Sequence, residues 1–280
     1  MRPSYDPSKD PFFIQYLNKL ESVTFEDIVL AAGRNKDYVA DTNRGTKILE
    51  TPGECNHYIE SFFYMHYFKI IDSISKLFSF HNIHNYSGTG IILYDWACGQ
   101  GLVSWLFLNQ LAEQRLKIKV AEIVLIEPSF IALKRAEILI RYIDKDVKIT
   151  TINKMLKDTK ASDLIKDEDT LRIHYISNFI DMLDWEAIDY FSKLIIESQK
   201  KQDYALVALS PYKAAALDRF INNFPEGHRE LISKRDCTQF NSCDTCTDNK
   251  KYCSESIQRR QTKRIERIAL VTTRQTQFSI

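Results

Sequence analysis

The feature that most constrains the fold is a glycine-containing loop between a short apolar run and an apolar helical segment. The loop reads Tyr94-Asp-Trp-Ala-Cys-Gly-Gln-Gly101, and the next apolar run ends at Glu127. Glycine permits a sharp turn and lets backbone N–H groups approach a ligand closely. A strand, loop, helix and acid-ended strand in this order, over residues 89–130, predict a nucleotide-cofactor site. The alternative is a tight turn, with Glu127 serving only the start of the following helix.

Apolar runs and helical segments alternate along the middle of the chain. Strands are expected at 91–94, 123–126, 147–152, 171–176 and 204–209, and helices at about 103–115, 129–142, 184–200 and 212–224. This alternation predicts an α/β fold, a doubly wound and mostly parallel sheet with helices on both faces. In such a sheet the carboxyl ends of neighbouring strands line one crevice, where ligands bind.

The identity of the nucleotide depends on what flanks the glycines. An NAD fingerprint requires a third glycine where this chain has Ser104, and it gives Asp95 no task. The stretch instead resembles the class I S-adenosylmethionine-dependent methyltransferases, in which one acid precedes a Gly-x-Gly loop and a second acid ends the next strand. Asp95, Gly99, Gly101 and Glu127 match that pattern. The resemblance implies that Asp95 and the loop hold the methionine portion, and that Glu127 holds the ribose hydroxyls.

Two residues of the loop need separate comment. The family usually has its first glycine where this chain has Ala97, and alanine is small enough to leave the backbone approach open. Cys98 follows in the same cofactor loop and is expected to be a small packing residue. Because both belong to this loop, Ala97 and Cys98 are counted with the cofactor-binding residues.

The carboxyl ends of the third and fourth strands supply the remaining site candidates. Asn153 is expected near the adenine, Ser177 and Asn178 near the cofactor, and Asn178 and Asp181 near the methyl acceptor. Relatives that methylate base amino groups often carry Asn/Asp-Pro-Pro-aromatic here, and this chain lacks both prolines, which disfavours that chemistry. Correct alignment of the methyl donor and acceptor can by itself lower the barrier to methyl transfer by about 7–11 kcal/mol. The reaction therefore needs no dedicated acid or base, and the sequence identifies no catalytic residue.

Four cysteines follow the α/β segment at close spacing. They are Cys237, Cys243, Cys246 and Cys253. Four thiolates suit a zinc ion or an iron–sulfur cluster, although the spacing is not that of a standard zinc ribbon. A basic run at 259–267 comes next; it is either solvated surface or a contact to a phosphate backbone.

These two features are similar to the tail of the mitochondrial small-ribosomal-subunit assembly methyltransferase-like family. Tyr252-Cys253, Gln258-Arg259-Arg260 and Lys263-Arg264 carry the similarity, while the prolines and histidine expected near the first cysteines are absent. The similarity implies a metal-stabilised module that binds RNA or the ribosome through the run 259–267.

The resulting organisation is a helical N-terminal cap over 1–88 and a Rossmann-like methyltransferase domain over 89–280. The cap is expected to contain helices within 11–33 and at 57–80, with a polar loop at 35–55. A C-terminal hairpin is expected from strands at 229–235 and 265–272, carrying a Cys-rich insertion (236–256) at its tip.

Composition limits the remaining function classes. The formal net charge is +1, so no global field attracts nucleic acid, and no secretory signal or membrane-spanning run is present, which predicts a cytoplasmic protein without membrane partners. The favoured function is a methyltransferase acting on RNA or a ribosomal component. A non-catalytic S-adenosylmethionine-binding assembly or interaction factor and a small-molecule methyltransferase remain open.

Overall fold

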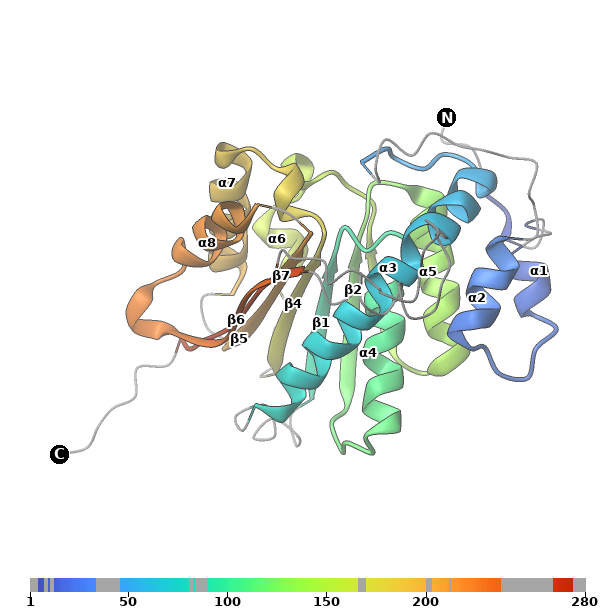
Figure 1. The fold of residues 1–280 in the computed structure, drawn as a ribbon, viewed down its shortest axis with the longest axis horizontal. Coiled ribbons are helices and arrows are strands. Elements are labelled where there is room, and N and C mark those ends of the chain that lie inside the picture. The colour runs from blue at the N-terminus through green and yellow to red at the C-terminus, as the bar shows by residue number, and fades with distance from the viewer. Residues whose placement is uncertain are drawn as a thin grey trace, which may run out of the picture.

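A seven-stranded sheet with the order β3-β2-β1-β4-β5-β7-β6 forms the centre of the protein (Figure 1). The computed structural model describes residues 5–7, 10, 13–33, 46–80, 83, 90–165, 170–199, 203–211, 213–237 and 264–273. The strands are β1 (Ile91–Trp96), β2 (Val120–Ile126), β3 (Lys148–Ile152), β4 (Leu171–Ser177), β5 (Tyr204–Ser210), β6 (Arg229–Cys237) and β7 (Arg264–Val271). The first five are parallel, and β7 pairs antiparallel with β5 and β6. The predicted fold class, an α/β fold with a doubly wound and mostly parallel sheet, is confirmed.

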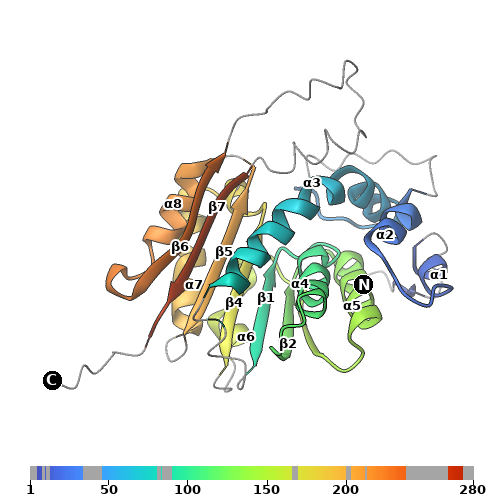
Figure 2. The same ribbon diagram turned by 60° about the horizontal axis from the view of Figure 1, so that its bottom comes forward.

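Helices cover both faces of the sheet, which is why its central strands β1 and β4 are buried along almost their whole length. One face carries α3 (Pro52–Ser79), α4 (Leu102–Glu113) and α5 (Phe130–Ile143), and the other α6 (Ala161–Leu164), α7 (Trp185–Ser198) and α8 (Ala214–Asn222). Figure 2 shows α3 lying along the sheet beside α4. Each layer has its own apolar core on its side of the sheet.

The long helix α3 begins earlier than the predicted residue 57. Thr51 and Glu54 form a capping box, and Pro52 occupies the first turn, a position that suits its missing N–H. The helix then crosses the sheet, where Ser73 hydrogen-bonds Tyr175 of β4 and Lys76 pairs with Glu266 of β7. Because α3 shares one apolar core with α4 and α5, it is part of the same packed layer. The boundary at residue 88 stays a prediction.

The remaining described elements are short. They are α1 (Ile14–Leu17), α2 (Phe25–Ala32) and the 3-10 helices η4 (Leu156–Asp158), η5 (Ile180–Met182) and η6 (Glu226–His228). Thr24 and Asp27 form the capping box that starts α2, and α2 packs against α3. No helix in the described part of the chain is both long and apolar enough to span a membrane.

Strands β6 and β7 form the C-terminal hairpin that the sequence predicts. Residues 238–263 at its tip lie outside the described residues, so the Cys-rich insertion stays a prediction. The same holds for Cys243, Cys246 and Cys253, and for the side chain of Cys237, which ends β6.

Candidate cofactor and acceptor site

The loop after β1 turns through three residues in the left-handed conformation. Ala97, Gly99 and Gly101 have φ values of 50°, 52° and 81°. Ala97 thus keeps a conformation that favours glycine, at a cost of about 1–2 kcal/mol. Two backbone hydrogen bonds hold the turn: Gly101 N–H donates to Cys98 O (2.8 Å), and Cys98 N–H donates to Ile126 O at the end of β2 (3.1 Å).

The two glycines of the loop have different surroundings. A methyl group built on Gly99 would meet no atom within 4 Å, whereas one on Gly101 would lie 2.8 Å from Cβ and 2.9 Å from Cα of Ala136 in α5. Gly101 therefore allows the start of α4 to pack closely against α5. Gly99 instead leaves an open cradle beside the backbone, the space that a bound ligand requires.

Asp95 lies buried near the end of β1, beside the start of α4. Its Oδ2 accepts hydrogen bonds from the N–H (3.2 Å) and the hydroxyl (2.7 Å) of Ser104. Burial raises the pKa of Asp95 to about 7; the two Ser104 bonds oppose this shift, and the neighbouring charge of Glu127 adds to it. From the sequence, Ser104 served only to exclude NAD; the structure gives it the task of orienting Asp95.

Glu127 connects the glycine loop to the start of α5. Its Oε2 accepts from Gly99 N–H (3.0 Å) and its Oε1 from Ser129 N–H (2.9 Å). Burial raises the pKa of Glu127 to about 7, against the pull of these two bonds. Ser129 caps α5, because its hydroxyl oxygen accepts from Ala132 N–H (3.1 Å). Gly99 and Glu127, which are 28 residues apart in sequence, therefore form one surface.

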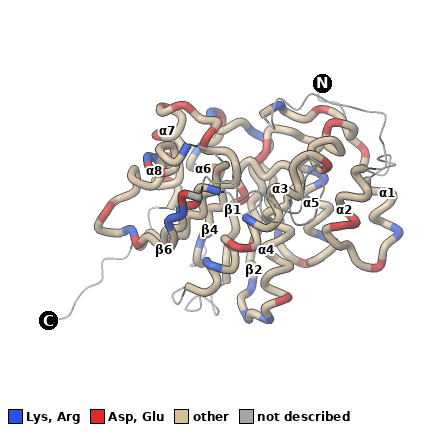
Figure 3. The backbone as a smooth tube through the Cα atoms, in the orientation of Figure 1, with Lys and Arg blue, Asp and Glu red and all other residues tan. Residues whose placement is uncertain are grey.

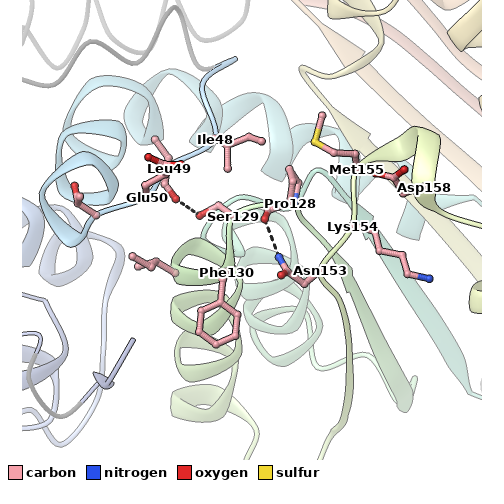
Figure 4. Close-up of a pocket in the computed structure, with 12 residues that line it drawn as sticks. Ile48, Leu49, Glu50, Pro128, Ser129, Phe130, Asn153, Lys154, Met155 and Asp158 are labelled. Carbon is pink, nitrogen blue, oxygen red and sulfur yellow. Dashed lines mark hydrogen bonds between the residues drawn. The ribbon is translucent and has the colours of Figure 1, made fainter. Parts of the chain in front are cut away.

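A cavity of about 770 Å³ opens beside Glu127 at the carboxyl ends of β2 and β3 (Figure 4). Its wall consists of Ile48, Leu49, Glu50, Thr51, Pro128, Ser129, Phe130, Ile131, Asn153, Lys154, Met155 and Asp158. The volume is within the range of small-molecule sites, roughly 300–1,000 Å³. Asn153 lies in this wall, and its Nδ2 donates to the carbonyl oxygens of Glu127 (2.9 Å) and Pro128 (2.8 Å). Its contact with the adenine stays a prediction.

The segment that precedes α3 forms one side of this cavity, which the sequence did not indicate. Ser129 Oγ donates to Leu49 O (2.5 Å), a bond that holds the segment against α5 (Figure 4). Ile48 and Met155 are each 41% exposed, which is unusual for large apolar side chains. They offer the apolar contact that a flat aromatic ring needs.

The loop is also tied to the N-terminal residues through a buried arginine. Gln100 Nε2 donates to Cys55 O (2.8 Å), and Gln100 Oε1 accepts from Nη1 of Arg135 (3.0 Å). Arg135 in turn pairs with the buried carboxylate of Asp10 (2.5 Å) and donates to Asn56 (2.8 Å). This network fixes the back of the loop to α3 and α5.

Ser177 and Asn178 lie at the carboxyl end of β4, next to the loop. In the parallel register of β1 and β4, Asp95 is paired with Tyr175 and Trp96 with Ile176. Asn178 follows Ile176 by two residues, so it lies at the level of the loop that follows Trp96. Asn178 has a left-handed φ of 56°, and its N–H donates to Leu209 O in β5 (2.8 Å). Its side-chain Nδ2 donates to Ser177 Oγ (2.7 Å).

Two residues of α3 contact Asn178, and neither was among the site residues predicted from the sequence. Lys69 Nζ donates to Asn178 Oδ1 (2.6 Å), and Asn178 Nδ2 lies 3.2 Å from Nδ1 of His66. Lys69 is 3% exposed. Burial lowers its pKa to about 7; the charge of Asp181 opposes this shift and that of Arg264 reinforces it.

Asp181, the second acceptor-side candidate, lies in η5 directly after β4. Burial raises its pKa above the ordinary value, against hydrogen bonds from its own backbone and from Ser210 and against the charges of Lys213 and Lys69. Its Oδ1 is buried and has no hydrogen-bond partner among the residues that the structure describes. The predicted pair Asn178 and Asp181 thus lies in one polar cluster at the edge of β4.

The described part of the basic run does not form a basic surface, which corrects the prediction for two residues. Arg264 and Arg267 lie in β7 and are each 1% exposed. Arg264 pairs with Asp72 and Glu266, and Arg267 pairs with Asp218 and Asp236. In Figure 3 basic and acidic residues are interspersed around these strands. Residues 259–263 lie outside the described residues.

A metal site was predicted only at the cysteine cluster. Within the residues that the structure describes, no group of three or more histidine, cysteine or acidic side chains could hold a metal ion. Cys98 is a buried free thiol in the apolar core, and burial raises its pKa well above the ordinary value. The zinc or iron–sulfur assignment therefore stays a prediction for residues outside the described part of the chain.

Solved structures similar to this chain are methyltransferases at low sequence identity. The bifunctional kinase-methyltransferase WbdD is 15% identical over 74% of this chain and 39% of its own, with a TM-score of 0.46. An S-adenosylmethionine-dependent methyltransferase of Leishmania major is 10% identical over 81% and 80%, with a TM-score of 0.46. A putative methyltransferase from Thermoplasma acidophilum is 11% identical over 66% and 68%, with a TM-score of 0.39.

This chain therefore spans well under half the length of WbdD. No protein-family model matches it, and no curated protein matches it. The narrower resemblance to the mitochondrial assembly family falls on residues outside the described part and stays a prediction.

Proposed function

We propose that this protein is an S-adenosylmethionine-dependent methyltransferase. The observation that carries the proposal is the open cradle at Gly99, which lies beside Glu127 at the carboxyl edge of β1 and β2. The crevice outside the carboxyl ends of the strands, where the strand order reverses, is where open α/β sheets bind ligands. Here β1 has β2 on one side and β4 on the other, so the cradle lies at that reversal.

The chemistry of the surrounding groups fits a cationic nucleoside. Asp95 and Glu127 are two buried carboxyls whose raised pKa values mean that ionisation is costly without a compensating charge. A sulfonium and an ammonium on one ligand would provide that charge. When bound, S-adenosylmethionine supplies an electrophilic methyl group.

Each residue then has one task in the proposed site. Asp95 and the loop residues Ala97, Cys98 and Gly99 hold the methionine portion, and Glu127 accepts hydrogen bonds from the ribose hydroxyls. The apolar rim and Asn153 receive the adenine in the cavity beside β3. Ser177 and Asn178 border the methyl group, and Gly101 acts by packing against α5.

For the acceptor we retain RNA or a ribosomal component. This part of the proposal depends on the basic residues Arg259, Arg260 and Lys263 and on the cysteine cluster. Arg264 and Arg267 do not contribute, because they pair with the acidic side chains of Glu266 and Asp218. Confined to the hairpin tip, the remaining charge would make a local contact, in agreement with the overall charge of +1.

The test is transfer of a tritiated methyl group to a fractionated cell lysate. The purified protein is incubated with labelled S-adenosylmethionine and separate RNA, protein and small-molecule fractions. Label in RNA or ribosomal protein supports the full proposal. Label in the small-molecule fraction would instead identify the acceptor as a small molecule. The variant Glu127→Gln is the matched control and should lose most transfer. Tight cofactor binding without any transfer would leave the non-catalytic assembly factor as the function.

A further inference from the structure

A polar cluster lies on the β4 side of the cradle, built from α3, the end of β4 and η5. We call Lys69, His66, Asn178 and Asp181 the Lys69 cluster. Lys69 Nζ donates to Asn178 Oδ1 (2.6 Å), His66 Nδ1 lies 3.2 Å from Asn178 Nδ2, and the charges of Lys69 and Asp181 act on each other. Lys69 and Asn178 are 109 residues apart, so the fold alone creates the cluster.

The cluster has hydrogen-bonding capacity that the described residues leave unused. A lysine ammonium has three N–H donors, and Asn178 provides one acceptor. Ser210 hydrogen-bonds the Asp181 carboxyl. The Oδ1 atom of Asp181 is buried and has no hydrogen-bond partner within the described part of the chain. Buried polar groups in folded proteins are almost always paired, so this oxygen and the remaining N–H groups of Lys69 can bind a further polar group.

The position of the cluster suits it to hold the methyl acceptor. None of its four members lines the 770 Å³ cavity beside β2 and β3, which fits the adenosine part of the cofactor. The cluster lies at the end of β4, the strand next to β1 on the other side of the loop. The methyl group must lie between these two regions if the acceptor is to reach it.

Burial, not the surrounding charge, favours the neutral amine of Lys69 near neutral pH. Burial lowers the pKa of Lys69 to about 7; Asp181 from η5 opposes the shift, and Arg264 from β7 reinforces it. His66, on the same helix, has a pKa held well below its ordinary value by burial and by Lys69, so it stays neutral. A group that titrates near the working pH is best suited to accept a proton during a reaction.

We propose that Lys69 is the general base of the methyl transfer and that the acceptor is an N–H or O–H nucleophile held by Asn178 and Asp181. The inference rests on the proposed function. The acceptor nitrogen or oxygen forms a bond to the methyl carbon, while the carbon–sulfur bond breaks and leaves its electron pair on sulfur. The proton of the acceptor moves to the Lys69 amine, which becomes an ammonium and returns the proton to solvent after the product leaves.

The first experiment measures Lys69 directly and needs no acceptor. Protein labelled with ¹³C at the lysine side chains is titrated by NMR, and the Lys69 signal is assigned from its loss in Lys69→Arg. We expect the Lys69 signal to titrate with a midpoint near 7. Lys193, whose side chain is 73% exposed on α7, serves as the reference signal. A Lys69 midpoint at the ordinary value of about 10.4 would overturn the proposal.

The second experiment separates the base from the cofactor site. Lys69→Arg keeps the positive charge but cannot give up its proton in the working pH range. In calorimetry it should bind S-adenosylmethionine with unchanged affinity. In the transfer assay with fractionated lysate it should move the labelled methyl group at least about 100-fold more slowly than wild type, which is the lower end of general-base effects. Lys193→Met removes a charge far from the cluster and should change neither quantity.

The pH profile identifies the base among the candidates. In the wild-type protein, whose Lys69 cluster is intact, the rate of methyl transfer should rise as pH increases through about 7. Full activity in Lys69→Arg would refute the assignment and leave the methyltransferase proposal standing. Retention of the slope in Lys69→Met but its loss in Asp181→Asn would make Asp181 the base instead. A wild-type protein that neither binds S-adenosylmethionine nor transfers label overturns the proposed function, and the role of Lys69 as its base with it.

Discussion

Gly99 and Gly101 differ in a way that a pair of alanine substitutions can measure. Both have left-handed φ values (52° and 81°), so alanine at either position costs about 1–2 kcal/mol in backbone strain. The added methyl of Gly101→Ala would also lie 2.8 Å from Cβ of Ala136, and overpacking of this kind costs typically about 1–3 kcal/mol. We therefore expect Gly101→Ala to lower the free energy of unfolding by about 2–5 kcal/mol and Gly99→Ala by about 1–2 kcal/mol.

Cofactor affinity should respond in the opposite order. The methyl of Gly99→Ala would project into the open cradle, so S-adenosylmethionine should bind at least about tenfold more weakly, equivalent to about 1.4 kcal/mol. Gly101→Ala, measured at a temperature where it remains folded, should bind almost as tightly as wild type. Urea titrations followed by circular dichroism give the stabilities, and calorimetry gives the affinities. Equal loss of affinity in both variants, or a stable Gly101→Ala, would refute this division of roles.

Four further predictions concern buried or capping groups. Because burial raises the pKa values of Asp95 and Glu127 to about 7, the cofactor-free protein should lose stability as pH rises toward 7, where their charges must be buried. A cationic ligand favours the ionised carboxylates, so calorimetry should find tighter cofactor binding as pH rises through about 7, with a flatter profile in Asp95→Asn. Arg135→Met leaves the Asp10 carboxylate buried without its partner and should cost about 3–5 kcal/mol in urea unfolding; a loss under about 1 kcal/mol would contradict the buried pair. Thr51→Ala removes the cap of α3 and should cost about 1 kcal/mol, whereas Thr51→Ser should restore it.

The central sheet could be predicted because most of its strands are short, largely apolar runs separated by amphipathic helices. The segments predicted at 123–126 and 204–209 lie within β2 and β5, and the acid-ended strands brought Asp95 and Glu127 to one edge as expected. The start of α3 was missed because Thr51-Pro-Gly-Glu54 is also the composition of a polar turn. Its capping role emerges once Thr51 and Glu54 hydrogen-bond each other's backbone.

The acceptor side could not be predicted, because its residues are brought together by contacts between distant segments. Lys69 is one lysine in an aromatic-rich helix, and only the packing of α3 over β4 places it on Asn178. For the same reason Arg264 and Arg267 resembled a solvated basic run, although their acidic partners include Asp72 and Asp218 from helices far away in the sequence. A charge pattern read along a chain does not reveal partners of this kind.

The most direct test of the central claim is a calorimetric titration of the purified wild-type protein with S-adenosylmethionine and, separately, with S-adenosylhomocysteine. We predict binding of both ligands at one site per chain, with affinity lost in Glu127→Gln and reduced in Gly99→Ala. Lys193→Met should bind as wild type does. Absence of binding for both ligands in a folded protein would contradict the assignment of the cradle at Gly99 to this cofactor.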